Sequence, residues 1–138
     1  MSATATIPDL WPTEFNVGPE PTPSTILRQQ GYILGERTRD VVFGEVESRQ
    51  ESPGRFIHTL WLSAPYLKLR QYALIVRHGL EGYPADVTLL DAGGQHLRKE
   101  TAVNAEQFMT VVREMLAAPH IVQLIGSLIA QARDLDDE

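Results

Sequence analysis

The fold is decided by residues 40–64, which read DVVFGEVESRQESPGRFIHTLWLSA. Side chains alternate between two faces over residues 42–49 and again over residues 55–64, and a period of two is the periodicity of a β-strand. Between the two runs, Pro53 and Gly54 stand in the order that a type II turn requires. The stretch therefore predicts a β-hairpin, and its second strand is expected to be central because both of its faces are partly apolar.

Two or three further strands are predicted after this hairpin. Pro65 ends the second strand, residues 69–78 resume the alternation, and residues 86–91 form a fourth strand. Two glycines at 93–94 allow a tight turn into a fifth strand through Leu97. Parallel strands need crossover helices, which this part of the chain lacks, so an antiparallel meander of four to five strands is expected.

Helices are predicted on both sides of the meander. Thr22 before Pro23 has the form of a helix start, and an apolar face continues from there to Gly35. Asn104 and Gln107 have the spacing of a capping box and open a second amphipathic helix. With the last helix described below, the pattern predicts an α+β domain: an N-terminal helix, an antiparallel meander, and two C-terminal helices covering one face of the sheet.

The last predicted helix, residues 121–132, has few polar positions. They form one narrow stripe, made of His120, Gln123, Ser127 and Gln131. The rest of the circumference is apolar, which is more than a helix lying on one side of a sheet requires. Val122, Ile125 and Ile129 are therefore predicted to bind a protein partner, although the sequence alone does not decide between core and interface.

The first 22 residues are predicted to be an arm. They contain four prolines, which remove backbone donors and disfavour both helix and central strand. They also contain large apolar side chains, and such side chains gain free energy only when they are buried. Either the arm packs across its own domain or it docks on another chain. In the second case Leu10, Trp11 and Phe15 are the expected partner-binding residues.

Length and charge indicate one domain, residues 23–133, between the arm, residues 1–22, and an acidic tail, residues 134–138. A chain of 138 residues is long enough to bury one apolar core without metals or disulfides. The net charge of −6 arises at the two ends, and residues 23–133 are close to neutral. Because the basic residues are scattered along the chain, nucleic-acid binding is not expected.

Several chemistries are disfavoured by residue type and spacing. Cysteine is absent, the glycines fit no phosphate-binding loop, and no nucleophile elbow is present. The four histidines stand singly rather than in a metal-binding motif. The sequence therefore predicts no catalytic residue, metal ligand or cofactor, and leans against an enzyme. It has no signal-peptide pattern and no apolar run of membrane-spanning length, so a cytoplasmic location without membrane binding is expected.

Two functions remain open. The first is a non-catalytic protein-interaction module, such as an adaptor, a dedicated chaperone, an immunity-type inhibitor or a complex subunit, with a protein partner or as a homodimer. The alternative is binding of a small anion, or a small enzymatic domain, at the end of the third strand. There Arg77 and His78, followed by Glu81 and Tyr83, would supply a cation, an imidazole, a carboxylate and a phenol.

Overall fold

The computed structural model describes residues 6–15 and 18–136. Their elements, in chain order, are α1 (Pro23–Arg37), β1 (Phe43–Ser52), β2 (Arg55–Ala64), the 3₁₀ turn η1 (Pro65–Leu67), β3 (Leu69–Gly79), β4 (Ala85–Leu90), β5 (His96–Ala102), α2 (Ala105–Leu116) and α3 (Pro119–Asp136). The strands form one antiparallel sheet in the order β1-β2-β3-β4-β5. The predicted α+β class and antiparallel meander are confirmed, with five strands.

The β1–β2 hairpin has the predicted turn. Gly54 has φ +77°, a left-handed conformation that glycine adopts without steric cost. A bulge follows on the other side of β2, because Leu60 pairs with Leu74 while Trp61 pairs with Tyr72. Ala73 is the extra residue in this bulge, and it is fully buried beside Leu74.

Helix α1 begins at the predicted cap, where the Thr22 hydroxyl accepts a hydrogen bond from the backbone N–H of Thr25 at 3.3 Å. The helix continues to Arg37, two residues beyond the predicted end at Gly35. It packs against β1 through Gly31 and Gly44, whose backbones lie so close that a Cβ on Gly31 would overlap the Gly44 carbonyl. The absence of side chains at both positions therefore fixes how near α1 lies to the sheet.

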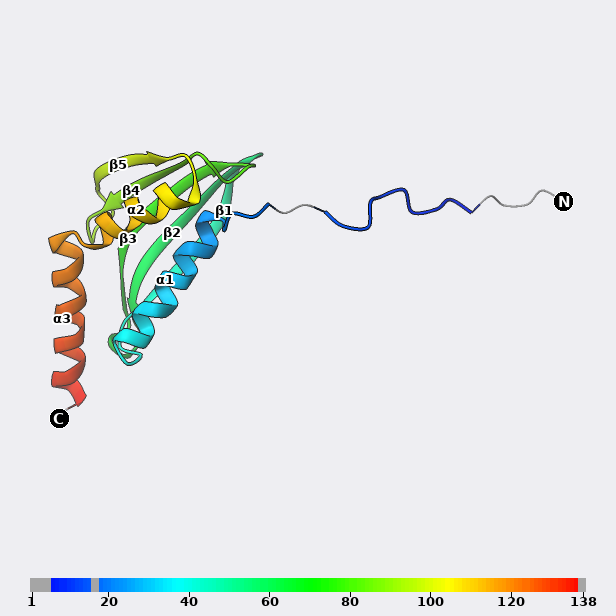
Figure 1. Ribbon diagram of the computed structural model, residues 1–138. Coiled ribbons are helices and arrows are strands. Elements are labelled where there is room, and N and C mark those ends of the chain that lie inside the picture. The colour runs from blue at the N-terminus through cyan, green and yellow to red at the C-terminus, as the bar shows by residue number, and fades with distance from the viewer. Residues whose placement is uncertain (1–5, 16–17, 137–138) are drawn as a thin grey trace.

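The core lies between the sheet and the helices on one of its faces (Figure 1). Helix α2 packs on β4 and β5 and begins at the predicted cap, where the Asn104 side chain accepts from the Gln107 N–H at 2.9 Å. The largest fully buried apolar side chains are Leu27, Val42, Leu62, Leu74, Val76, Val87, Leu90, Phe108, Met115 and Ile121. They come from α1, α2, the sheet, the segment before β1 and the start of α3, and all of them except Leu90 belong to one core cluster.

Helix α3 runs away from α2 along the side of the domain (Figure 1). The two helices are separated by a 62° bend, and α3 buries only Ile121, Leu128 and Ala132. It extends to Asp136, so residues 134–136 of the predicted acidic tail continue the helix, while residues 137–138 lie outside the described residues. Among the residues described, no single helix has the length and hydropathy of a membrane span; only α2 and α3 counted together reach them.

Candidate functional site

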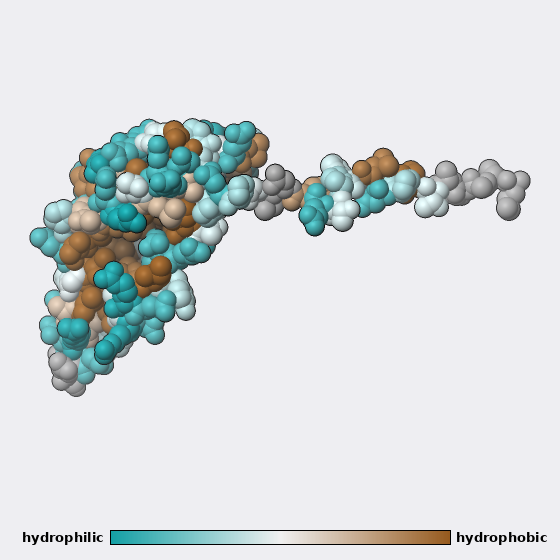
Figure 2. Space-filling model, in the orientation of Figure 1, coloured by the Kyte–Doolittle hydropathy of each residue, from teal (hydrophilic) through white to brown (hydrophobic). Residues whose placement is uncertain are grey.

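An apolar groove lies between α1 and α3, with part of the sheet as its floor. It has a volume of about 400 Å³ and is called the α1–α3 groove below. Its walls are Gln30, Gly31, Ile33, Leu34, Arg37 and Thr38 from α1 and Ile121, Val122, Ile125 and Ile129 from α3, with Gly44, Leu60, Leu62 and Leu116 between them. Figure 2 shows it as a continuous hydrophobic surface between the two helices.

The groove follows from the divergence of two helices. The bend after α2 turns α3 away from α1, so the facing sides of the two helices do not meet. The residues at 122, 125 and 129 repeat at spacings of three and four, which places them on one side of α3. Gly44 contributes no side chain to the floor, and the space therefore extends down to the sheet.

The three residues predicted on the last helix all line this groove. Val122 is 56% exposed, while Ile125 and Ile129 are half-buried. Ile33 on the opposite wall is also exposed. The excess of apolar residues in α3 is thus divided between a buried side, which includes Ile121, and a side open to solvent.

The polar part of the lining is cationic or neutral. Arg37 lies in the last turn of α1, where a positive side chain also complements the helix dipole. Arg37 makes no ion pair within residues 6–15 and 18–136; the arginines and lysine in ion pairs there are Arg70, Arg77, Arg98 and Lys99. Thr38 is engaged with the backbone of Leu34 and Val42, closing the end of α1. Arg37 is therefore available to a ligand of the groove.

The arm carries the other predicted partner-binding residues, and its described segment, residues 6–15, extends away from the domain (Figure 1). Leu10, Trp11 and Phe15 are 82%, 74% and 67% exposed. The ring centroids of Trp11 and Phe15 lie 5.9 Å apart in an edge-to-face contact, and the backbone N–H of Trp11 donates to the Asp9 carboxylate at 3.0 Å. In the structure these three side chains are exposed and do not pack across their own domain.

The base of the arm is attached to the domain. The Glu20 carboxylate accepts a hydrogen bond from the Ala105 N–H at 3.2 Å, at the N-terminus of α2, where a negative charge is stabilising. The Tyr83 hydroxyl donates to the Pro21 carbonyl at 2.8 Å. Burial, followed by the charge of Glu20, raises the pKa of Tyr83 to about 12, so this hydroxyl keeps its proton.

The residues of the alternative anion site are not brought together. Arg77 and His78 are consecutive in β3 and point to opposite faces of the sheet. The Arg77 guanidinium pairs with Glu51 at 3.3 Å, while His78 is buried on the helix side. Glu81 is exposed, and the Tyr83 hydroxyl is bonded to the arm. In this arrangement they do not converge on a common point.

A chain of hydrogen bonds on the helix side joins two buried histidines and was not predicted from the sequence. His78 Nδ1 donates to the Gly79 carbonyl at 2.7 Å, and with both rings neutral its Nε2 accepts from His58 Nε2, also at 2.7 Å. His58 Nδ1 then accepts from the Ser48 hydroxyl at 2.7 Å, and Ser48 accepts from Arg28 at 2.9 Å. Burial, the charge of His78 and the charge of Arg28 lower the pKa of His58 to about 4.

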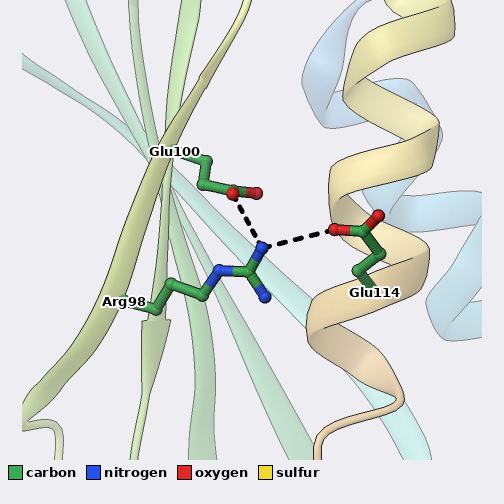
Figure 3. Close-up of polar contacts among 3 residues, drawn as sticks. All are labelled: Arg98, Glu100 and Glu114. Atoms are coloured by element: carbon green, nitrogen blue, oxygen red, sulfur yellow. Dashed lines mark hydrogen bonds and ion pairs between the residues drawn. The ribbon is translucent and has the colours of Figure 1, made fainter.

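A further polar cluster connects β5 with α2. Arg98 on β5 contacts Glu100 on the same strand at 2.7 Å and Glu114 on α2 at 3.3 Å (Figure 3). The hydrogen bond and charge of Glu100 raise the pKa of Arg98. The described residues contain no group of three or more potential metal ligands.

The opposite face of the sheet carries an aromatic pair. Trp61 stacks on Tyr72 with ring centroids 3.9 Å apart, and the Arg70 guanidinium lies 3.9 Å from the Trp61 ring. Arg70 is also paired with Glu47 at 2.6 Å. Because its charge is already engaged, this cluster offers less to a ligand than the α1–α3 groove.

Comparisons with known proteins give no relative for this chain. No family model matches it, and neither a curated protein nor a solved structure matches it. The interpretation of the groove therefore depends on its own geometry.

Proposed function

We propose that this chain is a non-catalytic protein-interaction module, which holds an apolar segment of a protein partner in the α1–α3 groove. The observation that carries the proposal is the solvent-open apolar lining, with Val122 56% exposed beside half-buried Ile125 and Ile129. Removing such surface from water is favourable, and contiguous exposed apolar surface commonly marks a binding site.

The shape of the groove favours a polypeptide over a small polar molecule. Its two walls are helices, and an apolar segment laid between helices is a recurrent mode of peptide recognition. A metabolite site usually adds several convergent polar groups that fix the orientation of its ligand. Here Gln30 and Arg37 are the main polar groups of the lining, since the Thr38 hydroxyl is bonded to backbone.

The wider role is part of the same proposal. An adaptor, a dedicated chaperone, an immunity-type inhibitor and a subunit of a complex all act by covering or presenting an apolar segment. Each of these roles needs a surface such as the α1–α3 groove, and none needs a catalytic group. A cytoplasmic location is proposed with them.

Site-specific photo-crosslinking tests the proposal. A photoreactive benzoyl-phenylalanine is placed at Val122 in the groove or, as the matched control, at Gln123, an exposed neighbour on α3 outside the lining. The chain is irradiated in the cells from which it comes. We expect one discrete crosslinked protein from position 122, absent from position 123 and reduced at least about tenfold by Ile125→Asp, because a buried charge opposes apolar binding. The absence of any protein crosslink from position 122 would contradict the proposed function.

A further inference from the structure

The chain carries two complementary apolar surfaces that do not meet in the structure. One is the α1–α3 groove, and the other is the arm segment Ile7–Phe15, whose large apolar side chains are 67% to 83% exposed. The edge-to-face contact of Trp11 and Phe15 presents two aromatic rings together. Aromatic groups of this kind are the usual anchors of a protein interface.

The charges of the two surfaces are also complementary. The arm segment Ile7–Phe15 carries Asp9 and Glu14 and no basic residue. The groove carries Arg37, which has no ion pair within the described part of the chain, and no acidic residue belongs to its lining. An arm in the groove would therefore place its carboxylates near an unpaired guanidinium.

The base of the arm determines which groove it meets. The Glu20 bond to the N-terminus of α2 and the Tyr83 bond to Pro21 hold the chain at the end of the domain where α1 begins. From there the arm leaves in the direction opposite to α3 (Figure 1). Its own groove lies along the second half of α1, beside α3, whereas the described arm segment Ile7–Phe15 points away from α3. In the structure this segment therefore lies outside its own groove and is exposed to a neighbouring molecule.

We propose that the α1–α3 groove binds the arm of a second copy of this chain, with Leu10, Trp11 and Phe15 on its apolar lining and Asp9 or Glu14 beside Arg37. The proposal rests on the proposed function of the groove. Exchange of the two arms is reciprocal, so the assembly is a closed dimer with two-fold symmetry.

A disulfide between two different chains tests this arrangement. The chain has no cysteine, so two variants with one cysteine each can be mixed: Thr13→Cys in the arm of one and Val122→Cys in the groove of the other. Under mild oxidation we expect a disulfide-linked heterodimer from this mixture. Val122→Cys is replaced by Gln123→Cys as the matched control, and the yield is expected to fall at least about fivefold because position 123 lies outside the groove.

The double variant Thr13→Cys/Val122→Cys distinguishes the two grooves. Crosslinked dimers from this chain at low micromolar concentration support exchange between copies. An internal disulfide in a monomer shows that the arm occupies its own groove and overturns the proposal. A chain that forms no disulfide and stays monomeric overturns it as well.

Sedimentation equilibrium of the full chain gives the strength of the dimer. Trp11→Ser/Phe15→Ser is expected to raise its dissociation constant more than about 100-fold, because both arms lose their aromatic anchors. Tyr32→Ser, an exposed aromatic on α1 outside the groove, is the control and should leave it unchanged. Arg37→Glu should raise the constant about two- to fivefold, and Asp9→Lys/Glu14→Lys on the same chain should restore it. Equal dissociation constants for the aromatic variant and the control overturn the proposal.

The experiments distinguish failure of the proposed binding function of the groove from failure of the proposal that the arm occupies it. If Val122 crosslinks to a different protein while the chain itself is monomeric, the groove is a binding site but its occupant is not the arm. If position 122 crosslinks to no protein and no dimer forms, both proposals are wrong.

Discussion

At the scale of single residues, the hydrogen-bond chain between Arg28 and Gly79 determines the protonation of two histidines. The Gly79 carbonyl can only accept, so His78 Nδ1 is a donor. With both rings neutral, His58 donates from Nε2 to His78 and accepts from Ser48 at Nδ1. A second proton on His58 would place a positive charge in a buried position near His78 and Arg28.

The stability of the protein should therefore depend on pH through His58. Its pKa falls from 6.5 to about 4 on folding, so the unfolded chain binds the proton more tightly. The stabilisation is fully present above pH 6.5 and is lost as the pH falls from there toward 4. The size of the shift corresponds to a loss on the order of 3 kcal/mol in the free energy of unfolding between neutral pH and a pH well below 4.

Urea unfolding at a series of pH values measures this dependence. We expect the free energy of unfolding to fall between pH 7 and pH 4.5, and the slope to be smaller in His58→Gln, which has no titrating imidazole. His96→Gln changes an exposed histidine and should keep the original slope. Identical slopes in wild type and His58→Gln would show that His58 does not carry the effect.

The sequence pointed to His78 only as part of the alternative anion site, and it did not indicate the contact of His78 with His58. His58 and His78 are twenty residues apart, and they meet because Phe56 pairs with His78 and His58 pairs with Val76, which makes the two histidines diagonal neighbours. The alternation of both strands was visible, but their mutual register was not. Knowledge of that register would have been enough to place both rings on the helix side.

At the scale of elements, the features that depend on neighbouring residues were predictable. The Thr22 and Asn104 caps and the Gly54 turn were all read from a few adjacent side chains, and all are present. The end of α3 was not predictable, since the helix continues from Ala132 to Asp136 and none of the four added residues is a glycine or proline that would end it. The direction of α3 was also not predictable, because it depends on the bend after α2 rather than on local propensity.

Helix α3 offers a paired test of its two sides. Ile121 is fully buried and Val122 is 56% exposed, although they are adjacent. Ile121→Ser should lower the free energy of unfolding by about 2–5 kcal/mol, because it removes buried apolar surface and buries a hydroxyl. Val122→Ser should change it by less than about 0.5 kcal/mol in the monomer. Urea unfolding at a protein concentration that favours the monomer measures both.

A loss above about 2 kcal/mol for Val122→Ser would show that this side of α3 belongs to the core. That outcome would remove the exposed lining from which the interaction module was proposed. A small effect at both positions would instead mean that α3 contributes little to the folded domain.

At the scale of the whole molecule, one core joins the helices to one face of the sheet, and two surfaces remain outside it. The arm was predicted as a proline-rich segment because proline density is a local property. Whether its apolar residues were buried was left open, since that depends on where the anchored Glu20 and Pro21 direct the chain. The groove was foreseen only as an excess of apolar residues on the last helix. Its opposite wall on α1 and its floor are visible only in three dimensions.

A dimer built by exchanged arms links stability to concentration, because binding between folded chains shifts the unfolding equilibrium by mass action. The melting temperature of the full chain should therefore rise with protein concentration, by about 2–5 °C from 1 to 100 μM. A chain that begins at residue 16 keeps the Glu20 and Tyr83 anchors but lacks the side chains expected in the groove. Its melting temperature should be independent of concentration and equal to that of the full chain at high dilution, since the removed side chains are exposed. If both chains show the same concentration dependence in a calorimetric series, the association uses another surface, and the arm has no part in it.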